Sequence, residues 1–167
     1  MAAQEILQLG SEILRQKAKR VPKGMRGLRK LVDRMFATMD TASGIGLAAP
    51  QIGVSLRVIV VDADEVRMAL VNPEIVKTSE ECILDEEGCL SYSSYYGPVN
   101  RYQSVVVKGR SLEGKEIRIR ATDLLARVFQ HEIDHLDGTL FLDRLDDPEQ
   151  LYRVEPETES DSPAEDS

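Results

Sequence analysis

The stretch that decides the fold is Gln130-His131-Glu132-Ile133-Asp134-His135-Leu136, because it predicts a helix and places metal-binding side chains on it. His131 and His135 are the only histidines of the chain, and their spacing puts them one turn apart on one face of a helix. Histidines at this spacing typically bind one metal ion, with the glutamate beside them as general base. The segment therefore predicts a metal-binding helix with Glu132 as its base.

The helix around this segment is expected to run from about Leu124 to Leu136. Leu124 and Val128 continue the stripe of the two histidines at helical spacing, so the histidine pair is expected to face inward. Thr122 or Asp123 can cap the first turn, and Gly138 can end the helix. A separate polar stripe follows from the same spacing and consists of Arg127, Gln130 and Asp134.

Two histidines do not complete a catalytic metal site, which usually takes three protein ligands and keeps one position for water. Cys89 is the preferred third ligand, because it lies in the glycine-flanked turn Glu87-Gly88-Cys89-Leu90-Ser91, where a thiolate can approach a metal closely. Cys82 is the rival thiol ligand, but it lies in an apolar, strand-like run, and we expect it to be buried with a structural role. Glu149, downstream of the histidines, is a weaker alternative ligand.

The rest of the chain predicts an α+β fold. Apolar residues recur three and four positions apart from Leu28 to Met39, which predicts an N-terminal amphipathic helix. Because the strand candidates do not alternate regularly with helices, mixed or antiparallel strands packed around the metal-binding helix are expected. A hairpin turn is expected at 111–114. The strand candidates are the β-branched or apolar runs 57–62, 69–71, 81–84, 104–108 and 116–120.

Composition predicts one ordinary domain in a chain of 167 residues with 42% hydrophobic side chains. We expect the catalytic domain over 1–153 and a disordered acidic tail over 154–167, which carries six acids and no base. No membrane partner is expected, because the longest charge-free stretch, 41–56, is too short for a span and is broken by glycines. The N-terminus lacks the pattern of a secretory signal, so a cytoplasmic location is expected, with an organelle not excluded.

A run of eight basic residues without an acid lies between Arg15 and Lys30. It is interpreted either as a solvated basic face or as a surface for transient contact with ribosomal RNA or another polyanion. No DNA partner is expected.

A further unusual segment is Gly44-Ile45-Gly46-Leu47-Ala48-Ala49-Pro50-Gln51, whose small residues allow a ligand to approach the backbone closely. A tight turn in the core would explain its glycines equally well. Together with 87–91 and 130–138, however, this segment meets in order the three signature patterns of the peptide deformylases. The chain from about Ile6 to Leu145 resembles this family.

The resemblance implies that the protein removes the formyl group from the N-terminal formyl-methionine of newly synthesised polypeptides, releasing formate. It implies that a metal is held by Cys89, His131 and His135, with Glu132 as general acid and base. A divalent ion there would activate water for attack on the formyl carbon.

The resemblance also assigns donors to the developing oxyanion, namely the side chain of Gln51 and the backbone N–H of Leu90. The methionine side chain requires an apolar pocket beside the metal, with Leu124 and Val128 as one wall and Ile45 opposite. Backbone groups near Ile45, Gly46 and Gly88 are expected to hold the peptide.

The ion implied by the resemblance is Fe²⁺, one per chain, with Zn²⁺, Ni²⁺ or Co²⁺ able to substitute. The chain departs from many relatives after the cysteine pattern, where it reads Tyr92-Ser93-Ser94-Tyr95-Tyr96-Gly97-Pro98 instead of continuing with Ile-Pro and a later arginine. These tyrosines either form a rim for the substrate or pack over the sheet edge. Two competing functions are an endopeptidase of the zinc-protease kind and a metal-stabilised binding protein without turnover.

Overall fold

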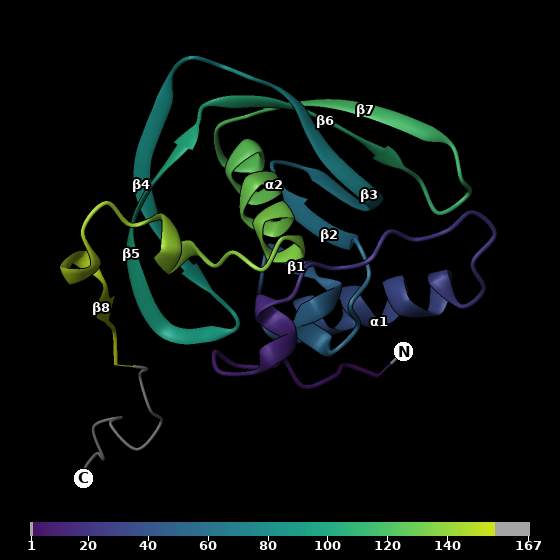
Figure 1. Cartoon of the computed structure of the whole chain (residues 1–167), viewed down its shortest axis with the longest axis horizontal. Coiled ribbons are helices and arrows are strands. Elements are labelled where there is room, and N and C mark those ends of the chain that lie inside the picture. The colour runs from purple at the N-terminus through teal and green to yellow at the C-terminus, as the bar shows by residue number, and fades with distance from the viewer. Residues whose placement is uncertain (1, 156–167) are drawn as a thin grey trace, which may run out of the picture.

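The fold consists of two antiparallel sheets with a central helix, α2 (Asp123–Leu136), between them (Figure 1). The computed structural model describes residues 2–155, so the expected acidic tail lies outside the described residues from position 156 onward. One sheet has five strands in the order β1-β2-β3-β6-β7, and the other has three in the order β4-β5-β8. The other elements are α1 (Leu28–Thr41), β1 (Gly46–Ala48), β2 (Val58–Ala63), β3 (Val66–Thr78), β4 (Cys82–Cys89), β5 (Tyr92–Tyr102), β6 (Ser104–Arg110), β7 (Glu116–Thr122), β8 (Tyr152–Arg153) and the 3₁₀ turns Glu12–Arg15, Ala49–Ile52, Phe141–Arg144 and Pro148–Gln150.

The main core lies between α2 and the five-stranded sheet. β6 alternates buried and half-buried residues, as expected of a strand with one face on a core. Phe129 of α2 is fully buried, and burial of a side chain of this size contributes roughly 2–3 kcal/mol. A second cluster of buried apolar residues lies between α1 and the strands β1 and β2. The apolar stripe of α1 contributes Met35 and Met39 to it. The apolar periodicity read from the sequence therefore places each helix on a face of this sheet.

The α+β class and the antiparallel strands agree with the sequence-based expectation, but the strands are longer and more numerous. Residues 69–71 lie within β3, which continues to Thr78 through a bulge after Val71. Residues 81–84 fall at the start of β4. β1, β5 and β8 were not predicted.

The prediction that Cys82 is buried was wrong. Cys82 is exposed, as are the next four residues of β4. β4 is an edge strand that pairs only with β5, and the unbroken run of exposed residues at 82–86 shows that neither face of its first half packs against the core. An apolar run in the sequence did not distinguish an edge strand from a buried one.

The end of α2 follows the sequence-based prediction. Gly138 has a φ of +76°, and a Cβ there would lie 2.5 Å from the carbonyl oxygen of Arg15. Glycine is therefore needed both for the left-handed turn and for the close approach of the N-terminal segment. At the other end, Thr122 is the N-cap residue, although its side chain makes no capping hydrogen bond. No helix in the described part of the chain is long and apolar enough to cross a membrane.

Candidate active site

Three metal-binding atoms meet where α2 faces the end of β4. Sγ of Cys89 and one ring nitrogen each of His131 and His135 all lie within 4.8 Å of one another. Sγ of Cys89 is 3.2 Å from Nε2 of His135. A thiolate and two imidazoles suit Zn²⁺ or Fe²⁺, so these residues fit a divalent ion. The alternative ligands weighed from the sequence, Cys82 and Glu149, do not belong to this group.

Glu87 fixes the orientation of His131. Its Oε1 lies 2.8 Å from Nδ1 of the ring, which leaves Nε2 for a metal. A carboxylate at this position is the usual support of a metal-binding imidazole. Burial by itself would raise the pKa of Glu87, but hydrogen bonds from Arg101 and His131 hold that pKa well below its ordinary value. The carboxylate is therefore charged.

The pKa values of the two histidines move in opposite directions. Burial opposes protonation of His131, but hydrogen bonds with Cys89 and Glu87 hold its pKa well above the ordinary value. Burial, followed by the charge of His131, holds the pKa of His135 well below the ordinary value. His135 is thus already in the neutral form that a metal requires.

Two buried arginines hold Glu87 in turn. Nε and Nη2 of Arg101 donate to its two carboxylate oxygens over 2.8 and 2.9 Å. Nη1 of Arg127 donates to Oε2 of Glu87 over 2.6 Å. Arg127 also donates to the backbone carbonyls of Ile83 and Val99, over 2.6 and 2.9 Å. Because Ile83 and Val99 lie on β4 and β5, one side chain ties both strands to α2.

The polar stripe predicted on α2 is buried rather than solvated. Gln130 exchanges two hydrogen bonds with the backbone of Tyr102, over 3.0 and 2.9 Å. Asp134 accepts from Arg101 over 2.6 Å and pairs with Arg144 over 2.8 Å. The stripe thus joins α2 to the three-stranded sheet through paired polar groups, as buried charges require.

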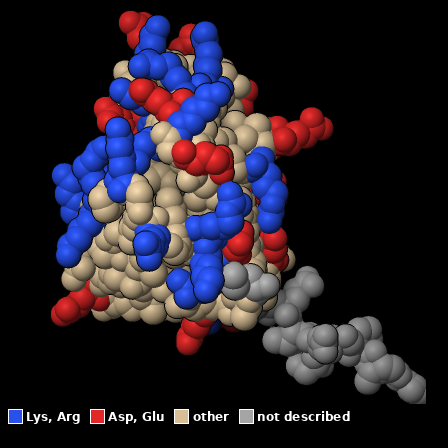
Figure 2. All heavy atoms as spheres, turned by 90° about the vertical axis from the view of Figure 1, so that its right-hand side faces the viewer, with Lys and Arg blue, Asp and Glu red and all other residues tan. Residues whose placement is uncertain are grey.

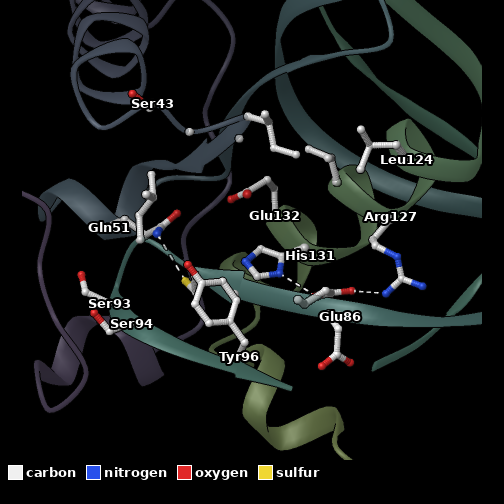
Figure 3. Close-up of a pocket in the computed structure, with 18 residues that line it drawn as sticks. Ser43, Gln51, Glu86, Ser93, Ser94, Tyr96, Leu124, Arg127, His131 and Glu132 are labelled. Atoms are coloured by element: carbon white, nitrogen blue, oxygen red, sulfur yellow. Dashed lines mark hydrogen bonds and ion pairs between the residues drawn. The ribbon is translucent and has the colours of Figure 1, made fainter. Parts of the chain in front are cut away.

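Gln51 points its amide nitrogen toward the sulfur of Cys89. Its Oε1 accepts from the backbone N–H of Ala48 over 2.9 Å, which fixes the direction of the amide. Its Nε2 donates to Oγ of Ser91 over 3.1 Å and lies 3.8 Å from Sγ of Cys89. Figure 3 shows the contact with the sulfur as a dashed line. The amide donor is therefore preorganised beside the metal-binding group.

Glu132 is buried against the backbone of β1. A Cβ at Gly46 would lie 2.5 Å from Oε2 of Glu132, so only glycine leaves room for the carboxylate. Oε1 of Glu132 is buried and has no hydrogen-bond partner among the described residues. Burial raises the pKa of Glu132 to about 7, with the charge of His131 acting in the opposite direction. A buried carboxyl with an unpartnered oxygen and such a pKa can exchange a proton near neutral pH.

A cavity of about 540 Å³ opens in front of these groups, as Figure 3 shows. The metal-binding group contributes Cys89 and His131 to its lining, while His135 lies buried behind them. Val128 is a buried part of the wall, whereas Ile45 and Leu124 are 46% and 44% exposed. The expected catalytic and substrate-binding residues in the lining are Ile45, Gly46, Gln51, Gly88, Leu90, Leu124, Val128 and Glu132.

Sequence reasoning missed several residues that shape the site. The role of Glu87 could have been predicted from the sequence, because this acid directly precedes the Gly88-Cys89 turn. Arg101 carries no local signal, because its partners are far away in the sequence. Helical spacing placed Arg127 on the polar stripe, but it did not reveal Glu87 as its partner. The tyrosines of the cluster lie in two different places. Tyr96 lines the cavity, whereas the rings of Tyr92 and Tyr95 stack 4.3 Å apart and Tyr92 also lies near Phe141.

Comparison with known proteins shows to which family this chain belongs. The family model described as polypeptide deformylase matches residues 3–151. This chain belongs to the peptide deformylase family. It is an enzyme that removes the formyl group from N-terminal formyl-methionine, the reaction of this family. The protease and the non-catalytic binding-protein interpretations are thereby set aside.

Individual relatives cover nearly the whole described fold. A peptide deformylase of Heliobacterium modesticaldum is 52% identical over 153 residues, covering 90% of this chain and all of the relative. The crystal structure of a Synechococcus elongatus peptide deformylase in complex with actinonin has a TM-score of 0.84 at 41% identity and covers 88% of this chain and 81% of that one. A Met-Ala-Ser-bound structure from Acinetobacter baumannii has a TM-score of 0.82 at 39% identity, covering 86% of this chain and 100% of that one.

Proposed function

We propose that Cys89, His131 and His135 hold one divalent ion and that Glu132 moves the proton during deformylation. The single observation that carries this proposal is the convergence of the three donor atoms within 4.8 Å beside a buried, unpartnered carboxylate oxygen. When bound, a divalent ion acidifies water and polarises the formyl oxygen. Glu132 accepts the proton of the attacking water and delivers it to the departing amine nitrogen.

Gln51 and Leu90 would stabilise the negative charge that develops on the formyl oxygen. Nε2 of Gln51 points toward the metal-binding group, and its direction is fixed by the bond from Ala48 to Oε1. The backbone N–H of Leu90 follows Cys89 directly and would be the second donor. Removing one such donor typically lowers the rate about 10²–10³-fold.

The substrate would lie along two edge strands that flank the cavity. β1 and β4 each stand at the end of their sheet, and Gly46 and Gly88 lie on their cavity side. Backbone groups of Ile45, Gly46 and Gly88 would hold the peptide, because an edge strand presents unpaired N–H and C=O groups. Leu124 and Val128 would contact the methionine side chain, with Ile45 opposite.

The ion is proposed to be Fe²⁺ in the cell, with Zn²⁺, Ni²⁺ or Co²⁺ able to replace it. A Cys and two His donors accept both iron and zinc, so the donor set supports the proposal without selecting the ion. Protein purified anaerobically should contain iron, and formate release from formyl-Met-Ala-Ser should follow the iron content. Stoichiometric zinc in such protein, with no gain in turnover on exchange for iron, would overturn the choice of ion.

Variants test the roles of the residues. Cys89→Ala is expected to lose both metal and formate release, whereas Glu132→Ala should retain metal and lose activity. Unchanged deformylation by Glu132→Ala would require a different proton carrier. Formate release from the wild type in the same assay establishes that the substrate is correct.

The basic segment 15–30 is proposed to make transient contact with ribosomal RNA. Figure 2 shows Lys and Arg side chains gathered on the face where the N-terminal end of α1 and the turn between β6 and β7 lie in Figure 1. A cavity of about 370 Å³ lies between this segment and β6. Its lining includes four basic side chains and two acidic ones, namely Arg20, Lys23, Lys108, Arg110, Glu74 and Glu116. The negatively charged phosphate groups of RNA bind to such basic surfaces.

Charge reversal tests this contact. Reversing Lys17, Lys23 and Arg26 together should weaken cosedimentation with ribosomes and leave peptide deformylation intact. Lys77→Glu, an exposed charge on β3, is the matched control. Unchanged cosedimentation of the triple variant would remove this proposal. The expected location, the cytoplasm or an organelle that synthesises formylated chains, stays a prediction.

A further inference from the structure

The two donors proposed for the oxyanion belong to different sheets. Gln51 lies in the 3₁₀ turn Ala49–Ile52, which follows β1 of the five-stranded sheet, whereas Leu90 lies between β4 and β5 of the three-stranded sheet. Groups that act together on one reacting atom must keep their geometry to within about 0.5 Å. The two turns must therefore be held at a fixed separation.

Residues 7–9, the N-terminal strap, are hydrogen-bonded to both turns. The backbone N–H of Leu7 donates to the carbonyl of Gln51 over 2.8 Å, and the N–H of Leu9 donates to the carbonyl of Ser91 over 2.7 Å. Figure 1 shows this part of the chain in purple, leading away from the N label. One short segment therefore bridges the two sheets beside the site.

The side chain of Gln8, in the middle of the strap, holds the second donor residue directly. Its Nε2 donates to the carbonyl of Leu90 over 2.9 Å and to the carbonyl of Ile6 over 3.3 Å. Its Oε1 lies 3.4 Å from Oγ and 3.5 Å from the backbone nitrogen of Ser93. Gln8 is exposed, so water could satisfy its amide and these partners are not needed for its own solvation. They fix the carbonyl of Leu90 to the strap.

Ser91 links the strap to the donors and to the proposed metal ligand. Ser91 is fully buried, and its Oγ accepts from Nε2 of Gln51 over 3.1 Å. Its backbone N–H donates to Sγ of Cys89 over 3.4 Å. Because Nε2 of Gln51 carries two N–H groups, one remains for the oxyanion. The strap thus binds the carbonyl of a residue that contacts both the amide donor and the sulfur.

We infer, from the oxyanion roles proposed above for Gln51 and Leu90, that the N-terminal strap sets the separation of these two donors and that Gln8 is a positioning residue for deformylation. Gln8 does not line the cavity, so it acts through the carbonyl of Leu90 and not on the substrate. Donors to an oxyanion stabilise the transition state more than the bound substrate. Loss of the Gln8 hydrogen bond should therefore lower kcat and leave KM nearly unchanged.

Replacement of Gln8 by an uncharged side chain of similar length tests the hydrogen bond. Gln8→Met should lower kcat for formyl-Met-Ala-Ser about three- to tenfold, the range expected for one lost hydrogen bond, with KM within about twofold of the wild type. Gln150→Met is the matched control, because Gln150 is an exposed glutamine in the turn Pro148–Gln150, and it should keep the wild-type kcat. An unchanged kcat in Gln8→Met, or an equal loss in Gln150→Met, would overturn the inference.

A donor restored at the same position should restore the rate. Gln8→Lys replaces the amide by an ammonium group that can donate to the carbonyl of Leu90. Its kcat should return to within about twofold of the wild type. A lysine variant as slow as Gln8→Met would overturn the role of this hydrogen bond.

Coupling to Gln51 separates positioning from a general loss of stability. Once the Gln51 amide is removed, the remaining donor has no partner whose separation must be kept. In a Gln51→Ala background, Gln8→Met should therefore lower kcat by less than about twofold. The same loss in both backgrounds would mean that the strap acts independently of the donor pair, and would overturn the inference.

The NMR signals of the two donors provide a readout apart from turnover. In nitrogen–proton correlation spectra of the zinc-loaded protein, the signals of the Gln51 side-chain amide and the Leu90 backbone amide should shift in Gln8→Met. They should coincide with those of the wild type in Gln150→Met. Unshifted donor signals in Gln8→Met would contradict the inference even where the rate is reduced.

Failure of the positioning role and failure of the proposed chemistry are distinguishable. If Gln8→Met releases formate as fast as the wild type while Gln51→Ala is slow, the strap has no positioning role and the proposed oxyanion donor stands. If metal-loaded Gln51→Ala itself keeps the wild-type kcat, the proposed role of Gln51 fails, and the positioning role fails with it.

Discussion

Gly46 and Glu132 are in such close contact that a Cβ on Gly46 would lie 2.5 Å from Oε2 of Glu132 and 3.0 Å from its Cγ and Cδ. Gly46→Ala must therefore displace the carboxylate. We expect formate release to fall about 10²-fold or more, because general acid–base catalysis contributes that much, while bound metal is unchanged. Steady-state kinetics with metal analysis of the same sample measures both. In a Glu132→Ala background, Gly46→Ala should add no further loss; a full additional loss there would show that Gly46 acts by another route.

Replacement of Glu87 should weaken metal binding. Glu87→Gln removes the charge that orients His131, leaves Arg127 without its carboxylate partner and leaves Arg101 paired only with Asp134. Loss of such an outer partner typically costs 10–100-fold in metal affinity. Competition with a chromophoric chelator would measure this change. Asp85→Asn should bind metal as the wild type does, and an unchanged affinity in Glu87→Gln would contradict the orienting role.

Asn72 should be important for stability without affecting catalysis. It has a φ of +52° at the bulge of β3, and its side chain accepts from N–H of Val21 over 2.8 Å and donates to the carbonyl of Val21 over 3.0 Å. Asn72→Ala leaves the Val21 N–H buried and unpaired, so the free energy of unfolding should fall by about 2–4 kcal/mol. Urea titration of the metal-free protein would measure it. Asn100→Ala, at an exposed position of β5, should stay within about 0.5 kcal/mol of the wild type.

Asp143 should give a pH-dependent contribution to stability. Burial tends to raise its pKa, but hydrogen bonds from Arg15 and the backbone of Leu140 hold the pKa below its ordinary value of 3.8. A lowered pKa in the folded state stabilises the protein above the unfolded-state pKa, and this contribution is lost as the pH falls through the folded-state pKa. Asp143→Asn should therefore lower the free energy of unfolding at pH 7 by at most about 1 kcal/mol, because the pair is partly exposed.

The difference between wild type and Asp143→Asn should shrink as the pH falls below about 4, where the unfolded carboxyl becomes protonated. Denaturant titrations at neutral pH and at about pH 3 would measure this. A difference that stays constant over this range would mean that the carboxylate charge does not contribute.

The sequence predicted the parts of this molecule that depend on local periodicity. The histidines of α2 lie on one stripe because helix geometry alone dictates it, and Gly138 ends the helix by its backbone freedom. β5 was missed because Gly97 and Pro98, which are unfavourable in strands, interrupt the segment that holds its tyrosines. It is a strand because β4 pairs with it along most of its length, and that pairing is not encoded in the strand itself.

The residues that hold the proposed metal ligands in place were harder to predict from the sequence. Periodicity identified the polar stripe of α2 but did not show whether water or protein faces it. The answer depends on Arg101, whose side chain reaches Asp134 and Glu87 from another strand. Such partners are set by tertiary packing, so a single sequence does not reveal them.

The placement of the two sulfurs at the two ends of β4 gives the protein an internal reference for chemical titration. Cys82 is exposed, whereas Cys89 is half-buried among the proposed ligands. A thiol-reactive dye should therefore count one fast-reacting group in fully loaded protein and a second after chelation, since a coordinated thiolate is shielded. The ratio of the two signals would report how much of the metal site is occupied in each preparation. In a Cys82→Ser protein, Cys89 would give the only signal.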